Sequence, residues 1–234
     1  MTGTLYGLGI GPGDPDLITV KALKILQATP VLAYPALEDG DSLARAIVAP
    51  HLVAPKTEIA IRIPMTVDRA PAQKAYDIAA REIGHHLTSG QNVVVLCEGD
   101  PFFYGSFMYL FGRIAEKFPV EVIPGVSSLT ACATALQSPL SARNDVLTVL
   151  PAPLPSDALA AQLNATDSAA IMKVGRHFER VRDLIVELGL EENARYIERA
   201  TMDNQKILPL REVAANAAPY FSMILIHKRG QAWK

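Results

Sequence analysis

Residues 93–96 are Val-Val-Val-Leu, an apolar run without the polar alternation of a strand that has one face in water. Such a run, rich in β-branched residues, predicts a strand that is covered on both faces. Strands of this kind are typical of parallel sheets with helices on either side. The run therefore predicts an α/β fold.

The rest of the chain alternates short apolar runs with longer stretches of helical periodicity. We expect strands at 5–10, 31–34, 58–62, 92–97, 120–123, 146–150, 169–173, 195–198 and 222–227. We expect helices at 20–27 (with Thr19 as N-cap), 72–87, 104–117, 127–137, 157–163, 178–188 and 212–218. The second half looks like another strand–helix alternation. We therefore predict two lobes, 1–117 and 118–234, with a hinge at Phe118-Pro119.

The composition excludes several classes of protein. Half of the 234 residues are hydrophobic and a fifth are charged, which is enough to build a core. A net charge of −2 argues against broad electrostatic binding to nucleic acid or to a membrane. Cys97 and Cys132 form no CxxC pair, which excludes a disulfide scaffold and favours a reducing cytoplasm. We find no membrane anchor, no metal-ligand cluster and no Ser/His/Asp grouping in the pattern.

The first motif follows the first expected strand. Residues 7–15 are Gly-Leu-Gly-Ile-Gly-Pro-Gly-Asp-Pro. A dinucleotide fingerprint needs GxGxxG, but Pro12 or Asp14 occupies the place of the third glycine in the two possible registers. A nicotinamide oxidoreductase is therefore disfavoured. Two interpretations remain: a tightly packed turn, or a loop that lets a ligand approach the backbone.

Two more glycine-containing turns follow later strands. Residues 98–106 are Glu-Gly-Asp-Pro-Phe-Phe-Tyr-Gly-Ser, and residues 124–128 are Pro-Gly-Val-Ser-Ser. Asp100 could accept hydrogen bonds from an amine or a ribose, or it could cap a helix; Ser127 as N-cap explains most of the third turn. Because ligands of open α/β sheets bind at the carboxyl ends of the strands, three such turns suggest one shared cleft.

Taken together, the three loops resemble those of the tetrapyrrole methylases, the S-adenosylmethionine-dependent enzymes of cobalamin and sirohaem synthesis. The general marks are 9–15, 99–101 and 124–127, and the resemblance extends from about Tyr6 to His227. Segments 63–66, 98–108, 171–176, 198–202 and 219–223 resemble the subgroup that methylates precorrin-2 at its C(20) meso carbon, giving precorrin-3A. A cobalt-containing substrate, a uroporphyrinogen methylase, a diphthine synthase and a ribosomal-RNA methylase remain alternatives.

The resemblance implies two αβα lobes with S-adenosylmethionine in a cleft between them, usually in a homodimer. Met172 by itself would be interpreted as a core residue, and only the resemblance moves it to the adenine pocket. Carried over position by position, the cofactor neighbours are Pro12, Gly99, Asp100, Phe103, Ser127, Ser128, Met172, Ala200 and Leu225.

The implied substrate brings its own nucleophilic carbon, so at most a general base is required; Glu98 and Tyr104, beside the cofactor loop, are hypotheses for it. A module that binds the cofactor without turnover is the non-enzymatic alternative. Because the implied substrate is rich in carboxylates, we expect basic residues to converge on one cleft, although each could instead be a solvated surface charge. The candidates are Arg62, Arg143, Lys173, Arg176, His177 and Arg199.

Overall fold

The computed structural model describes residues 1–38, 40–64 and 69–229. The chain divides into two compact units, 1–127 and 128–234. The boundary lies ten residues later than the predicted one, because residues 120–123 pair with the first strand and so belong to the first unit. Met65 and Thr66, from one of the segments used for the subgroup, lie outside the described residues.

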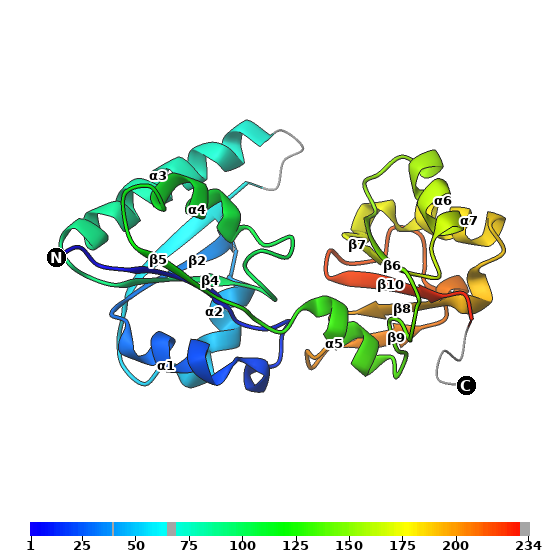
Figure 1. Ribbon diagram of the computed structural model, residues 1–234, viewed down its shortest axis with the longest axis horizontal. Coiled ribbons are helices and arrows are strands. Elements are labelled where there is room, and N and C mark those ends of the chain that lie inside the picture. The colour runs from blue at the N-terminus through cyan, green and yellow to red at the C-terminus, as the bar shows by residue number, and fades with distance from the viewer. Residues whose placement is uncertain (39, 65–68, 230–234) are drawn as a thin grey trace. The chain divides into compact units, whose positions relative to one another are not determined.

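The first unit contains a parallel sheet of five strands (Figure 1). The strands are β1 (Leu5–Gly9), β2 (Val31–Leu37), β3 (Thr57–Ile63), β4 (Val93–Cys97) and β5 (Val120–Ile123), in the spatial order β3-β2-β4-β1-β5. β4 lies between β2 and β1, and all five of its residues are buried. The prediction of a strand covered on both faces is confirmed.

Helices cover both faces of this sheet (Figure 1). α3 (Arg69–Thr88) and α4 (Phe107–Ile114) form one apolar cluster with the sheet. α1 (Val20–Ala28) and α2 (Leu43–Val48) form a second cluster on the opposite face. Thr19 caps α1 as predicted, because its side chain accepts a hydrogen bond from the backbone N–H of Ala22. Short 3₁₀ turns lie at Pro15–Leu17 and Ala49–His51.

The second unit contains a mixed sheet of five strands. They are β6 (Leu147–Pro151), β7 (Ser168–Met172), β8 (Ala194–Glu198), β9 (Lys206–Leu208) and β10 (Ser222–His227), in the order β6-β7-β10-β8-β9. β6 and β7 are parallel, whereas β10 is antiparallel to both of its neighbours. β6, β7 and β8 therefore point the same way, and their carboxyl ends share an edge with the amino end of β10.

This sheet is also covered on both faces. α6 (Ser156–Ala165) and α7 (Phe178–Glu187) pack on one face, and α5 (Ser128–Ala135) packs on the other. Each unit is thus an αβα sandwich, as the resemblance implied. Further 3₁₀ turns lie at Gly175–His177, Glu191–Asn193 and Leu210–Glu212. Among the described residues, no helix is both long and apolar enough to span a bilayer.

Three sequence-based expectations differ from the structure. The helix at 212–218 is wrong: a 3₁₀ turn ends at Glu212, and Asn216 has a φ of +60°. α2 was not expected, because six residues are too few to show helical periodicity; the Ser42 side chain caps it. β9 was also missed, since its three residues pair only at the edge of the sheet.

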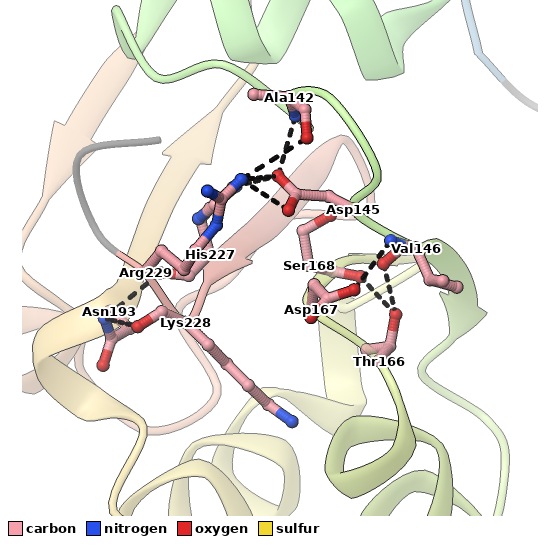
Figure 2. A network of polar contacts seen from close by, with 10 residues as sticks. All are labelled: Ala142, Asp145, Val146, Thr166, Asp167, Ser168, Asn193, His227, Lys228 and Arg229. Carbon is pink, nitrogen blue, oxygen red and sulfur yellow. Dashed lines mark hydrogen bonds and ion pairs between the residues drawn. The ribbon is translucent and has the colours of Figure 1, made fainter. Parts of the chain in front are cut away.

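A polar network joins the amino end of β6 to the carboxyl end of β10 (Figure 2). Asp145 accepts hydrogen bonds from the backbone N–H of Ala142 and from the guanidinium of Arg229. Its Oδ2 also lies 3.1 Å from Nε2 of the buried His227. Asp145 therefore anchors the residues that follow β10.

Candidate functional site

Three loops meet at the carboxyl edge of the first sheet, because β1, β4 and β5 are parallel neighbours or next neighbours. The backbone N–H of Gly99 donates to the carbonyl of Gly11 at 2.8 Å. A Cβ on Gly125 would lie 2.1 Å from the carbonyl oxygen of Gly99, and a Cβ on Gly9 would lie 2.4 Å from the nitrogen of Gly125. Tight packing of backbone on backbone therefore accounts for Gly9 and Gly125, while Gly11 and Gly99 have positive φ angles of 81° and 68°.

Asp100 fastens the second loop to the third. Its Oδ1 accepts hydrogen bonds from the backbone N–H groups of Phe102 and Phe103, at 2.9 and 3.1 Å. Its Oδ2 accepts from the N–H of Gly125 at 3.1 Å. Asp100 thus caps a local turn, while α4 begins only at Phe107. The carboxylate is engaged by backbone groups, and its role toward a cofactor stays a prediction.

The two residues considered as general bases flank this loop. Burial raises the pKa of Glu98 above its ordinary value, although backbone N–H groups of Glu98 and Ala44 oppose the rise. Tyr104 has a φ of +57°, a left-handed conformation that is costly for a bulky residue, and its side chain is exposed. Strain of this kind concentrates at functional sites. A carboxyl with a raised pKa is suited to accept a proton near neutral pH.

The remaining candidates in the first unit lie along the same edge. Pro12 is buried next to the Gly11–Gly99 contact, and Phe103 packs edge-on against Tyr104 with ring centroids 5.3 Å apart. Ser127 ends the third loop. Arg62 lies on β3, separated from β4 by β2. Its guanidinium donates to the backbone carbonyls of Leu37 and Glu38, which close the end of β2.

Three cofactor candidates of the second unit share one apolar cluster on the α5 face of the sheet. Met172, Ala200 and Leu225 pack there with the buried Cys132 of α5, and Ser128 is the first residue of that helix. Met172 remains partly exposed, whereas Ala200 and Leu225 are buried. Because β10 pairs with both β7 and β8, the fold brings Met172, Ala200 and Leu225 together, although they are 28 and 25 positions apart in the sequence.

Four basic candidates lie at the shared edge of β7 and β8. Lys173 and the 3₁₀ turn with Arg176 and His177 follow β7, and Arg199 follows β8. The pKa of His177 is lowered, first by burial and then by the charges of Arg176 and Arg180. These residues form a cationic edge, defined here as Lys173, Arg176, His177 and Arg199.

Arg143 does not belong to this cationic edge. It precedes β6, next to Ala142 of the Asp145 network, and so lies at the opposite end of the strands. The expectation that all basic candidates of the second unit converge is therefore wrong for Arg143. The alternation of side chains along a strand does not show at which edge of the sheet that strand begins, because the direction of each strand depends on its pairing.

Glu198 has no role in the expectations drawn from the sequence, although it directly precedes Arg199 of the cationic edge. Glu198 is buried at the end of β8 and accepts a hydrogen bond from the hydroxyl of Tyr196 at 2.9 Å. It also forms an ion pair with Arg199, with Nη1 and Oε2 3.2 Å apart. The available signal was an acidic residue at the end of the expected strand 195–198.

Comparisons with known proteins agree with this architecture. The model of the family described as Tetrapyrrole (Corrin/Porphyrin) Methylases matches residues 4–214. The chain is 40% identical to a precorrin-2 C(20)-methyltransferase from Sinorhizobium sp, covering 96% of this chain and 95% of that protein. It is 34% identical to a cobalt-precorrin-2 C(20)-methyltransferase from Salmonella typhimurium, covering 98% of each.

Another relative is longer. The chain is 38% identical to the cobalamin biosynthesis protein CobIJ of Mycobacterium tuberculosis, and it spans 46% of that protein's length.

Solved structures share the fold. A cobalt precorrin-4 methyltransferase, CbiF, matches with a TM-score of 0.71 at 24% identity, covering 96% of this chain and 94% of that one. A uroporphyrin-III C-methyltransferase from Thermus thermophilus, complexed with S-adenosylhomocysteine, matches with a TM-score of 0.66 at 20% identity, covering 97% and 92%. Given the family match over residues 4–214 and the identity to full-length relatives, this chain belongs to the tetrapyrrole (corrin/porphyrin) methylase family.

Proposed function

We propose that the chain methylates precorrin-2 at the C(20) meso carbon, giving precorrin-3A, with S-adenosylmethionine as donor. The observation that carries this proposal is the 40% identity to the Sinorhizobium precorrin-2 C(20)-methyltransferase over nearly the whole of both chains. The two αβα units and the three loops at the first sheet's carboxyl edge are consistent with it.

The residues present suit an adenosyl compound. In the second unit, the apolar cluster that holds Met172, Ala200 and Leu225 offers a surface for a flat adenine ring, because Met172 is partly exposed. In the first unit, Pro12, Gly99, Asp100 and Phe103 lie in the loops at the carboxyl edge. Ser127 and Ser128 bring hydroxyls and backbone N–H groups at the start of α5. We assign these residues to cofactor binding.

When bound, S-adenosylmethionine supplies the methyl group, whose bond to sulfur breaks as the bond to the meso carbon forms. The contribution of the chain is then mainly alignment, which can lower a barrier by about 7 kcal/mol in favourable cases. A proton must leave the methylated carbon. We propose Glu98 as its acceptor, since its raised pKa favours the protonated form, with Tyr104 as the other candidate.

We further propose that the cationic edge binds the carboxylates of the tetrapyrrole. Lys173, Arg176 and Arg199 offer ammonium and guanidinium donors, and each charge-assisted hydrogen bond contributes about 1.5–3 kcal/mol. Arg62 of the first unit stays a further candidate, since its backbone bonds to Leu37 and Glu38 involve only Nη1. Arg143 is no longer proposed, because it lies at the other end of the strands.

A cobalt-containing form of the substrate is the second candidate. The 34% identity to the Salmonella cobalt-precorrin-2 enzyme over 98% of each chain favours it almost as well. Both activities would use the same donor and the same carbon, so the residues assigned above serve either one.

We also propose that the chain works as a homodimer in the cytoplasm. On α4, Met108, Tyr109 and Phe111 are 36–41% exposed, and Phe102 next to them is 50% exposed. Contiguous exposed apolar side chains of this kind mark protein interfaces. Sedimentation of the wild type should show a dimer, and Phe111→Glu should yield a monomer; a monomeric wild type would contradict the proposal.

The proposed activity is tested by incubating the protein with either precorrin-2 or its cobalt form and a donor labelled with ¹³C in the methyl group. Carbon NMR of the product should show the label on C(20). Label on any other carbon, or none with both substrates, would refute the proposed function. Comparing initial rates decides between the two substrates.

A further inference from the structure

Glu198 is a buried acidic residue at the end of β8, with 5% of the residue's surface exposed. Burying a carboxylate is costly unless hydrogen bonds or a cation compensate for it. Here both oxygens are engaged. Oε1 accepts from the hydroxyl of Tyr196 at 2.9 Å, and Oε2 lies 3.2 Å from Nη1 of Arg199.

Tyr196 holds Glu198 from within the core. Its ring is buried and packs edge-on against Phe178 of α7, with centroids 5.3 Å apart. Residues 196 and 198 lie on the same face of β8, because strand side chains alternate. Burial and the neighbouring carboxylate raise the pKa of Tyr196, so that its hydroxyl stays protonated and donates. The acceptor is thus attached to a rigid ring.

Arg199 reaches this acceptor through an unusual backbone conformation. In a regular strand, the side chains of residues 198 and 199 would point to opposite faces. Arg199 instead has a φ of +48°, in the left-handed region, which lets neighbouring side chains meet. Its backbone N–H donates to the carbonyl of Phe221 at 2.8 Å, and its carbonyl accepts from Met202 at 3.0 Å. The conformation is fixed at both ends.

The guanidinium of Arg199 keeps access to solvent. About a third of the side chain is exposed (32%), against 7% for the side chain of Glu198. A guanidinium has five N–H donors, and Glu198 engages one nitrogen of Arg199. The rest of the fork is suited to a second carboxylate.

We propose that Glu198, held by Tyr196, is a positioning residue that orients the guanidinium of Arg199 to bind one carboxylate of the tetrapyrrole substrate. The inference rests on the proposed function, since it assumes a polycarboxylate substrate at the cationic edge. Glu198 itself does not touch the substrate. It limits the orientations of a long, rotamer-rich side chain, so less entropy is lost on binding.

Charge and positioning predict opposite results for Glu198→Gln. Removing the negative charge makes the edge more positive, so charge alone predicts a lower KM for an anionic substrate. A positioning role predicts that KM rises about tenfold, the factor that corresponds to losing a hydrogen bond to a charged group at the low end of its usual strength. It also predicts that kcat stays within about twofold of the wild type. Tyr196→Phe removes only the hydroxyl that holds Oε1 and should raise KM by a smaller factor.

A double-mutant cycle tests whether Glu198 acts through Arg199. We would measure KM and kcat for Glu198→Gln, Arg199→Gln and the double variant, with the exposed Glu192→Gln of the same unit as matched control. We expect Glu198→Gln to add nothing once Arg199 is absent, and Glu192→Gln to match the wild type. Equilibrium binding of S-adenosylhomocysteine should be unchanged in all of them, which also shows that they are folded.

An unchanged or lowered KM in Glu198→Gln would overturn the proposal, and so would additive effects of the two substitutions. A loss of affinity for S-adenosylhomocysteine equal to that for the tetrapyrrole would also overturn it, because the effect would then be general. Should circular dichroism show that Glu198→Gln does not fold, the KM of Tyr196→Phe decides by the same criterion. A wild type that methylates no tetrapyrrole refutes the proposed function itself, which is a distinguishable result.

Discussion

Asp100 holds two loops of the first unit together, and Asp100→Asn should break one of its three hydrogen bonds selectively. Asparagine keeps a single acceptor oxygen, which can preserve the bonds from Phe102 and Phe103. Its NH₂ group then faces the N–H of Gly125, which has lost its acceptor. Since a hydrogen bond to a charged group contributes about 1.5–3 kcal/mol, we expect the free energy of unfolding to fall by that amount.

Urea unfolding followed by circular dichroism measures the change, with Asp100→Ala and Asp16→Asn as references. Asp100→Ala removes all three bonds and should cost about 1 kcal/mol more, the usual value of a capping interaction. Asp16 is exposed in the 3₁₀ turn Pro15–Leu17, so Asp16→Asn should stay within about 0.5 kcal/mol of the wild type. An Asp100→Asn variant as stable as Asp16→Asn, or as unstable as Asp100→Ala, would contradict a selective loss of the bond to Gly125.

Three further predictions use the same unfolding assay. Gly125→Ala should lower the free energy of unfolding by about 3 kcal/mol or more, because its Cβ would lie 2.1 Å from a carbonyl oxygen. Gly112→Ala on the open side of α4 should raise it by about 0.5–1 kcal/mol, and equal effects of the two substitutions would contradict the packing argument. The pKa of Asp145 is lowered, first by its hydrogen bond with Arg229, so its contribution to the free energy of unfolding is present above pH 3.8 and is lost as the pH falls further. Asp145→Asn should weaken the pH dependence of stability below 3.8, and an unchanged pH dependence would contradict this prediction. Burial raises the pKa of Glu98 above 4.5, so the stability of the wild type falls as the pH rises from 4.5 through the pKa of Glu98 in the folded protein. The stability of Glu98→Gln relative to the wild type should therefore increase from pH 4.5 to 7, and a constant difference would exclude a raised pKa.

The α/β class and most of the strands could be predicted from local sequence patterns. The buried run at 93–96 was decisive, because only a strand covered on both faces lacks polar alternation. Short elements such as α2 and β9 were not predicted, because six and three residues are too few to show a periodicity. The order of the glycine loops also pointed to the family, and Gly9, Gly105 and Gly125 of these loops lie where a Cβ would meet backbone atoms at less than 3 Å.

Which side chains share an edge of a sheet depends on strand pairing and could not be predicted from the sequence. Apolar periodicity looks the same for a parallel and an antiparallel strand, so nothing in β10 reveals that it runs against β7 and β8. Strand direction separates Arg143 from the cationic edge. The left-handed conformation of Arg199 turns its own side chain toward Glu198. Both depend on pairing between residues far apart in the chain, which local sequence does not encode.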